Sequence, residues 1–104
     1  MTIPMRDANS SHTFHQYCLR LPKGTDRKRL QVQLLEAGIP TAVYYPTPLS
    51  AQPAFGSGAR VVAHGTPQAH DAAARILALP MHTELTEAMQ TRVVDKLFRL
   101  LWST

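Results

Sequence analysis

The sequence predicts one small α/β (α+β) domain, in which a sheet of about three strands carries packed helices. The chain has 104 residues, 44% of them hydrophobic, which suits a single compact domain with one modest core. Segments with the two-residue periodicity of strands alternate with segments that have the periodicity of helices. Their order is strand, helix, strand, loop, helix, short strand and helix, which predicts a sheet with helices packed on it.

The first two predicted elements are a strand at 14–22 and a helix at 26–37. The strand alternates, and the residues on its more apolar face are Tyr17, Leu19 and Leu21. The helix has leucines at helical spacing, Thr25 or Asp26 is placed to cap its first turn, and Gly38 directly follows its last turn.

A second strand is expected at 41–45, because β-branched and aromatic residues favour strands and Pro40 cannot continue the preceding helix. The segment that follows, 46–65, has little periodicity. Its early prolines predict a stiff loop, and its later glycines predict a mobile one. Within it, the glycine pair of 56–60 is typical of a linker rather than of a phosphate site.

The remainder of the chain predicts two helices and a short strand. Thr66 and Pro67 form a cap and first-turn pair for the first helix, whose small apolar residues should pack closely. A short strand is expected within 76–81, and Thr86 then caps the final helix. The residues of that helix expected to face the core are Met89, Val93, Leu97 and Leu100.

The chain is basic, with a formal net charge of +4 and a sequence pI of about 9.7. This charge favours anionic partners in general, but the eleven Lys and Arg residues are spread along the chain. A small nucleic-acid binder has no support beyond this charge, since neither a groove-reading helix nor an aromatic RNA platform is evident. We therefore expect no nucleic-acid partner.

The amino-terminal residues and the single cysteine bear on the compartment. The chain does not open with a charged segment followed by an apolar run, and no hydrophobic stretch is long enough to cross a bilayer. Cys18 lies in an apolar-rich run without a partner for an internal disulfide, so it is interpreted as a small buried side chain. We expect a soluble, cytoplasmic protein with no membrane partner.

The residue types that catalysis needs are not brought together by the sequence. The lysines are each typical of solvated surface charges, and the five histidines lack the spacing of zinc ligands. Neither a P-loop nor a dinucleotide-binding glycine motif is present. The residues alone therefore predict no catalytic group, no cofactor-binding residue and no metal site.

The segment with the most chemical content is the uncharged, proline-rich loop at 43–55. Its prolines restrict φ and remove donors, so it can hold a shape without a hydrogen-bond ladder. Two tyrosines, a hydroxyl and an amide there suit a neutral, polyhydroxylated ligand. These candidate substrate-binding residues are Tyr44, Tyr45, Ser50 and Gln52. The simpler alternative, favoured by the residues alone, places one tyrosine in the core, uses the other to cap it, and leaves the prolines as a plain connection.

Three stretches together resemble a known family. They are SSHTFHQYCLRL (Ser10–Leu21), LLEAGIPTAVYYPTPLSAQPAF (Leu34–Phe55) and ILALPMHTELTE (Ile76–Glu87). In order and spacing they are similar to the carboxy-terminal region of the DegT/DnrJ/EryC1/StrS sugar aminotransferases. These pyridoxal-phosphate enzymes aminate the keto sugar of a nucleotide-linked hexose for lipopolysaccharide, other surface glycans or antibiotic sugars. The resemblance implies a small domain like that of fold-type I aminotransferases at residues 10–104, with residues 1–9 as a flexible join.

The resemblance also implies what lies outside these residues. In the family, the cofactor and its Schiff-base lysine belong to a larger amino-terminal domain, to which nothing here corresponds. We therefore expect this chain alone to bind no cofactor and to be inactive. In the full-length enzyme we expect pyridoxal phosphate, a nucleotide-sugar substrate, the missing cofactor domain and a homodimeric state, whereas this piece should be monomeric.

By position in the family pattern, the residues implied to touch the nucleotide sugar are again Tyr44, Tyr45, Ser50 and Gln52. His15 is implied to be a packed strand histidine. One alternative from another functional class stays open, namely a free-standing, non-catalytic binding or interaction module that reuses this fold. Stable independent folding with a measurable ligand site would favour that module.

Overall fold

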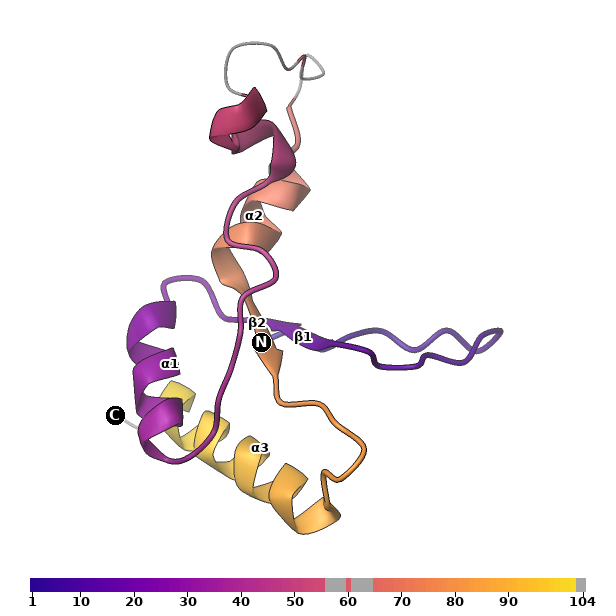
Figure 1. Cartoon of the computed structure of the whole chain (residues 1–104), viewed down its shortest axis with the longest axis vertical. Coiled ribbons are helices and arrows are strands. Elements are labelled where there is room, and N and C mark those ends of the chain that lie inside the picture. Colours follow the sequence, from indigo (N-terminus) through magenta and orange to yellow (C-terminus); the bar gives the residue numbers. More distant parts are fainter. Residues whose placement is uncertain (56–59, 61–64, 103–104) are drawn as a thin grey trace.

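The computed structural model describes residues 1–55, 60 and 65–102 (Figure 1). In chain order its elements are β1 (Tyr17–Arg20), α1 (Arg27–Glu36), the 3-10 turns η1 (Leu49–Ala51) and η2 (Pro53–Phe55), α2 (Pro67–Arg75), β2 (Ile76–Leu79) and α3 (Glu87–Trp102). This mixture of helices with one small antiparallel sheet confirms the predicted α+β fold class. The glycine-rich stretch that the sequence predicts to be a mobile linker lies outside the described residues, except for Arg60 and Gly65.

The sheet is built from β1 and β2, which pair antiparallel with Leu19 opposite Leu77. On its outer side β1 bridges to the start of the chain. Thr2 and Arg20 exchange two backbone hydrogen bonds there, each of 2.9 Å. The amino-terminal segment therefore covers one edge of the sheet, where unpaired backbone groups would otherwise face solvent.

β1 is shorter than the strand predicted at 14–22. Phe14 has a φ of +50°, in the left-handed region that an extended strand does not contain, so regular pairing cannot begin there. His15 consequently precedes β1 and is exposed, and the expectation that it is a packed strand histidine is wrong.

The prediction of a second strand at 41–45 is also wrong, since only Ala42 pairs there, through an isolated bridge to Ala78. The two residues exchange backbone hydrogen bonds of 3.1 and 2.8 Å. In this antiparallel register the next hydrogen-bonded pair on one side would be Pro40 with Pro80, and neither residue has an N–H to donate. The ladder therefore stops, and over the described residues the sheet has two strands rather than about three.

On the other side of that bridge the next hydrogen-bonded pair would be Tyr44 with Ile76. The N–H of Ile76 donates to the carbonyl of Ala72 at the end of α2. The carbonyl of Ile76 accepts a hydrogen bond of 3.2 Å from Nη1 of Arg27. Because both backbone groups of Ile76 are engaged, the ladder does not extend to Tyr44, and the chain leaves the sheet as a loop.

The core lies between the sheet and the packed helices α1 and α3. Its buried aliphatic residues are Leu19, Leu21, Leu30, Leu34, Ile39, Leu77, Val93 and Leu97. The predicted buried faces of β1 and α1 are thereby confirmed. Met89, which was expected to face this core, is 44% exposed. It lies in the first turn of α3, and the buried face of that helix begins one turn later, at Val93.

The predicted helix caps are largely present. The carboxylate of Asp26 accepts a hydrogen bond of 3.1 Å from the backbone N–H of Arg29 at the start of α1. Gly38, just past the end of α1, has a φ of +80°, which glycine adopts without the strain of a side chain. The hydroxyl of Thr86 accepts a hydrogen bond of 3.2 Å from the N–H of Met89 at the start of α3.

α2 stands outside the leucine core. It begins at Pro67 as predicted, but the side chain of Thr66 makes no capping hydrogen bond. Among the residues of α2, Ala73 alone is buried, and it does not belong to the core cluster. Figure 1 shows α2 and the loop beside it rising from the sheet as an arm, with α1 and α3 at the opposite end. The prediction that α2 packs closely through its small residues is therefore confirmed only at Ala73.

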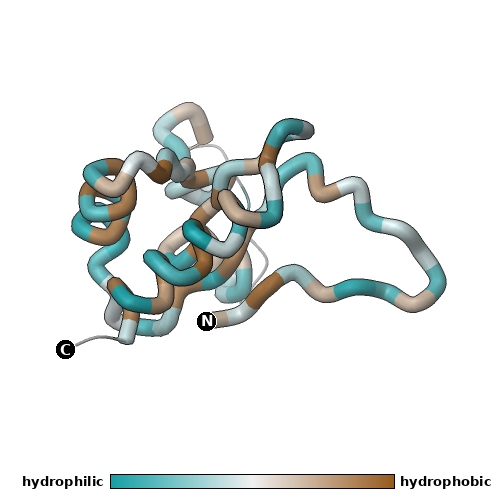
Figure 2. The backbone as a smooth tube through the Cα atoms, turned by 90° about the horizontal axis from the view of Figure 1, so that it is seen from below, coloured by the Kyte–Doolittle hydropathy of each residue, from teal (hydrophilic) through white to brown (hydrophobic). Residues whose placement is uncertain are grey.

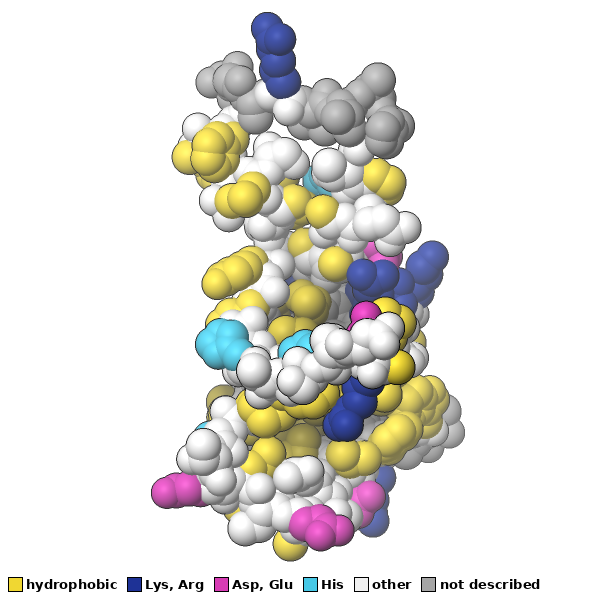
Figure 3. Space-filling model, turned by 90° about the vertical axis from the view of Figure 1, so that its right-hand side faces the viewer, with side chains coloured by type: hydrophobic (Ala, Val, Ile, Leu, Met, Phe, Trp, Pro, Cys, Tyr) yellow, Lys and Arg dark blue, Asp and Glu magenta, His cyan; other side chains and the backbone are white. Residues whose placement is uncertain are grey.

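The described chain is extended. Its radius of gyration is 16.0 Å, whereas a compact domain of this length has about 13 Å. Besides the arm that holds α2, the segment 5–14 forms a loop that extends sideways from the sheet in both backbone views (Figures 1 and 2). Many large apolar side chains consequently remain exposed, and Figure 3 shows such side chains along the face that it presents.

Candidate functional site

The proline-rich loop leaves the sheet after Ala42 and runs beside α2 (Figure 1). It is shaped by short-range turns rather than by a ladder. In η1 the N–H of Ala51 donates to the carbonyl of Pro48 at 3.0 Å, and in η2 the N–H of Phe55 donates to the carbonyl of Gln52 at 3.0 Å. These bonds join residues three apart, as in a 3-10 helix, and agree with the prediction that the loop holds its shape without a strand partner.

A groove of about 240 Å³ lies between this loop and α2. The loop side presents Tyr44, Tyr45 and Gln52, and the α2 side presents Ala69, Ala72 and Ala73. The structure thus brings three of the four candidate substrate-binding residues to one place. Ser50, the fourth, lies half-buried on η1 and does not line this groove.

Both tyrosines face solvent. Tyr44 is 40% exposed and Tyr45 is 68% exposed, and their rings meet edge to face with centroids 5.7 Å apart. The alternative in which one tyrosine enters the core and the other caps it is therefore wrong. The rings instead form one aromatic wall of the groove.

A second hollow of about 240 Å³ lies on the other side of Tyr44. It is lined by His15 and Gln16, which directly precede β1, and by Thr41 and Met81 among others. Tyr44 therefore separates two neighbouring hollows. Sequence reasoning missed this role of His15 because the alternating pattern placed the histidine inside a strand.

Sequence reasoning also missed the alanine wall. Ala69, Ala72 and Ala73 recur at helical spacing, which is the same signal that a close-packed core helix produces. Only the position of the loop beside α2 shows that these methyl groups line a groove instead. The helical spacing of these alanines is thus the one local sequence signal that could have pointed to a groove wall on α2.

The groove is neutral, because none of the described residues that line it is charged. Its aromatic rings and alanine methyl groups offer apolar surface, and the Gln52 amide offers two donors and an acceptor. Ligand pockets commonly combine mostly apolar walls with a few placed polar groups. A sugar ring, with C–H faces and hydroxyl edges, matches this combination.

The groove offers binding rather than covalent chemistry. Among the described residues that line it there is no lysine, cysteine or carboxylate that could act as a nucleophile or base. Cys18 lies on β1 and is half-buried rather than buried as expected; this partial burial raises the pKa of the thiol and favours the less reactive protonated form. Over residues 1–55, 60 and 65–102, no group of three or more potential metal ligands comes together. Within the same part of the chain, no helix has both the length and the apolar character needed to cross a bilayer.

A larger hollow of about 500 Å³ lies elsewhere, between the start of α1 and the end of α3. It is lined by Lys23, Asp26, Arg29 and Trp102 among others. Its carboxylate is already used to cap α1, and none of the candidate substrate-binding residues reaches it. The groove beside the tyrosines therefore remains the candidate site despite its smaller volume.

Sequence comparison places the chain in a family. The family model described as "DegT/DnrJ/EryC1/StrS aminotransferase family" matches residues 1–98. The chain belongs to the DegT/DnrJ/EryC1/StrS aminotransferase family. This membership confirms the resemblance carried by the three sequence stretches, and it covers the sheet, the groove and most of α3.

Two curated relatives are similar in sequence to this chain over most of its length. It is 48% identical over 86 residues to a "Pleiotropic regulatory protein" of Geobacillus stearothermophilus, which covers 83% of this chain and 22% of that protein. It is 35% identical over 85 residues to a "UDP-2-acetamido-2-deoxy-3-oxo-D-glucuronate aminotransferase" of Pseudomonas aeruginosa, covering 82% of this chain and 22% of that protein. The chain thus spans less than a quarter of the length of these relatives.

A solved structure shares the fold. It is a DegT DnrJ EryC1 StrS aminotransferase from Brucella abortus, with a TM-score of 0.84 and 30% sequence identity. The match covers 98% of this chain and 26% of that one. The extended shape of this family chain, arm included, is therefore the shape of the corresponding part of a much longer aminotransferase.

Proposed function

We propose that this chain is the carboxy-terminal small domain of a pyridoxal-phosphate-dependent aminotransferase that acts on a nucleotide-linked keto sugar. The observation that carries the proposal is the fold match over 98% of this chain to about a quarter of a family aminotransferase. The similarity to a relative named as an aminotransferase of a UDP-linked 3-oxo sugar supports the substrate class. Synthesis of lipopolysaccharide or another surface glycan is the corresponding pathway class.

In this proposal residues 10–104 are the domain and residues 1–9 are the join to the rest of the enzyme, which we call the parent enzyme. The extended shape supports such a role, because an arm with little core behind it suits a piece that rests against another body. The parent enzyme is proposed to be a homodimer. A cytoplasmic location fits the free thiol of Cys18, which a reducing compartment preserves.

The groove is proposed to receive the sugar part of the substrate. The rings of Tyr44 and Tyr45 offer apolar faces to the C–H groups of a sugar, and the Gln52 amide can bond its hydroxyl groups. Ser50 does not line the groove, so it is proposed to contact only a part of the substrate that extends beyond the groove. At about 240 Å³ the groove falls below the roughly 300–1,000 Å³ of a pocket that encloses a whole small molecule. The nucleotide part must therefore bind mainly outside this chain.

The cofactor is assigned to the parent enzyme and not to this chain. Pyridoxal phosphate would supply the electron sink for amino-group transfer, and a lysine and a cationic phosphate site would be needed to hold it. The described residues that line the groove include no lysine and no cationic group for a phosphate, so they do not fit the cofactor. What this chain contributes is orientation of the sugar, which alone can account for a large part of a rate enhancement.

The size of the native polypeptide tests the proposal first. An immunoblot of a lysate from the source cell, with an antibody raised against this chain, distinguishes a domain of a longer enzyme from a free-standing module. A band several-fold heavier than 11.5 kDa is expected for the parent enzyme. A band at 11.5 kDa would overturn the proposal and leave the free-standing, non-catalytic interaction module as the function to pursue.

A further inference from the structure

The alanine wall of the groove is part of a helix that has little apolar attachment to the rest of the chain. α2 contributes no residue to the leucine core, and Ala73 alone among its residues is buried. A helix without a buried apolar face gains little stabilisation from packing. Other bonds must therefore help to hold it, and among the described residues the long-range hydrogen bonds to α2 gather at its carboxy-terminal end.

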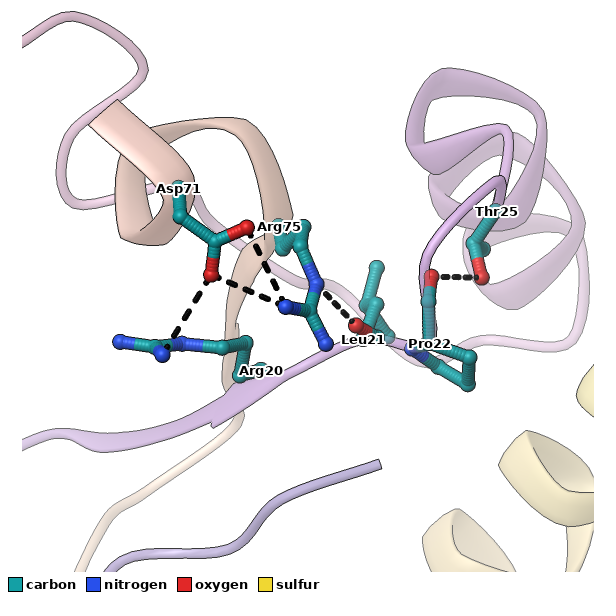
Figure 4. A network of polar contacts seen from close by, with 6 residues as sticks. All are labelled: Arg20, Leu21, Pro22, Thr25, Asp71 and Arg75. Carbon is teal, nitrogen blue, oxygen red and sulfur yellow. Dashed lines mark hydrogen bonds and ion pairs between the residues drawn. The ribbon is translucent and has the colours of Figure 1, made fainter. Parts of the chain in front are cut away.

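Arg75, the last residue of α2, forms the main attachment (Figure 4). Its Nε donates a hydrogen bond of 2.8 Å to the carbonyl of Leu21, and its own carbonyl accepts a hydrogen bond of 2.8 Å from the N–H of Leu21. Leu21 is 1% exposed and belongs to the core. Arg75 thereby ties the end of α2 to a residue that the core holds in place.

Asp71, one turn earlier in α2, completes this attachment. Both of its carboxylate oxygens accept hydrogen bonds from Nη1 of Arg75, at 3.2 and 2.9 Å. Arg20 of β1 adds an ion pair, with its Nη1 3.4 Å from Oδ2 of Asp71 (Figure 4). A guanidinium held on two sides keeps its orientation better than one held by a single bond. We call these three residues the arginine anchor.

Arg27 of α1 supports the same end of the helix. Its Nη1 donates to the carbonyl of Ala73 at 2.6 Å and to the carbonyl of Ile76 at 3.2 Å. The last carbonyls of a helix lack partners within the helix, and a cation there is favourable because the helix dipole is negative at this end. The end of α2 is therefore held by side chains of both β1 and α1, through charge-assisted hydrogen bonds.

The wall that α2 contributes to the groove is made of alanine side chains. Ala72 and Ala73 lie between Asp71 and Arg75 on the same helix, and both line the groove opposite Tyr45. An alanine methyl group has no rotamer with which to adjust, so the wall stands wherever the helix backbone stands. Any tilt of α2 is passed on in full to the width of the groove.

We propose that Arg75 is a positioning residue of the groove, and that the arginine anchor sets the distance between the alanine wall and the tyrosine loop at which a sugar fits. This inference rests on the proposed function, because it needs the groove to be the sugar site. Arg75 itself does not line the groove, so it acts through α2 and not by touching the ligand.

The test compares Arg75→Met with Arg92→Met in the parent enzyme. Arg92 is a matched control, because its Nη2 also donates to a backbone carbonyl, that of Ala37 at 2.5 Å. The two bonds join residues 54 and 55 positions apart, but the Arg92 bond ties α3 to the end of α1, away from the groove. Both variants remove a long-range bond from an arginine to a backbone carbonyl, although the Arg92 bond is the more exposed of the two. A shift of α2 is expected only for Arg75→Met.

Arg75→Met is expected to raise the KM for the nucleotide sugar about tenfold, while Arg92→Met changes it less than about twofold. The KM for the amino donor and the absorbance of the bound cofactor should stay unchanged in both. Hydrogen exchange measured by mass spectrometry should become faster in the peptide that spans 67–75 only for Arg75→Met. Arg75→Lys, which keeps a cation near Asp71, should restore part of the lost affinity.

An unchanged KM in Arg75→Met, or an equal rise in Arg92→Met, would overturn the inference. If Arg75→Met does not fold, Asp71→Asn decides, because it removes the charge but leaves the two bonds between Arg75 and Leu21. A rise in KM of about threefold then supports the anchor, and no rise overturns it. If Gln52→Ala raises the KM and Arg75→Met does not, the role of the arginine anchor is contradicted while the groove remains the proposed sugar site. If neither does, the groove is not the sugar site.

Discussion

The rings of Tyr44 and Tyr45 meet edge to face, with centroids 5.7 Å apart and planes inclined at 69°. Such a pair stabilises its own geometry beyond what area burial contributes. Both rings nevertheless stay largely open to solvent on the loop side of the groove. An aromatic wall that is already ordered loses little conformational entropy when a ligand stacks on it, which favours binding.

Tyr45→Phe in the parent enzyme keeps the ring and tests whether the hydroxyl group of Tyr45 also bonds the sugar. Loss of one hydrogen bond, worth about 0.5–1.5 kcal/mol, should raise the KM for the nucleotide sugar about two- to twelvefold. Cofactor loading should be unaffected. Tyr17→Phe is the control, because Tyr17 packs against the core on β1 and does not line the groove. Unchanged kinetics in Tyr45→Phe would remove this hydroxyl from the site.

Gln52→Ala tests the polar group of the groove. Removal of the amide should raise the KM for the nucleotide sugar about fivefold, since a sugar hydroxyl then loses its partner. Ser50→Ala is the neighbouring control and should change the KM by less, because Ser50 does not line the groove. Steady-state kinetics of both variants decide, and a larger effect at Ser50 would contradict the geometry of η1.

Ala72→Leu tests the width of the groove. The larger side chain fills space next to Tyr45, so kcat/KM for the nucleotide sugar should fall about tenfold or more. Ala74→Leu lies on the same helix, is exposed and does not line the groove, so it should leave kcat/KM nearly unchanged. Circular dichroism of both variants checks that α2 remains helical. Equal kinetics in the two variants would show that the groove takes no substrate.

Leu34→Ala tests the core of the isolated chain. Leu34 is 0% exposed, and its truncation should lower the free energy of unfolding by about 3 kcal/mol. Leu35→Ala, at the next position of α1, removes a side chain that is 63% exposed and should cost less than about 0.5 kcal/mol. Urea denaturation measures both. Equal losses would mean that α1 does not present this face to the sheet.

Cys18 leads to a prediction on pH. Burial raises the pKa of its thiol above the value in the unfolded chain, so the fold favours the protonated form. This contribution to stability is complete below the unfolded thiol pKa and is lost as the pH rises through the raised, folded pKa. Unfolding of the wild type in urea should therefore become easier from neutral to alkaline pH, and Cys18→Ala should weaken that trend. An identical pH dependence in the two proteins would contradict the burial of the thiol.

Several elements were predictable because the forces that form them act over a few residues. The alternation of β1, the Asp26 cap and Gly38 of α1, and the Thr86 cap of α3 are all visible in short windows of the sequence. The family membership was likewise readable, because its motifs are runs of neighbouring residues. The loop around Tyr45 was singled out for the same reason; the structure places it along a groove, and its part in substrate binding stays a prediction.

The sequence by itself thus determined the three helices, most of their caps, the buried faces of β1 and α1, and the family. Only the tertiary structure decided that 41–45 is no strand, because the partners that end its ladder, Pro80 and Ile76, lie more than thirty positions away. It also decided that the alanines of α2 line a groove with Tyr45 and Gln52, whereas Ser50 stays outside. The physical reason is the same in each case: hydrogen bonds and walls between distant segments depend on the placement of whole elements, which no local pattern encodes.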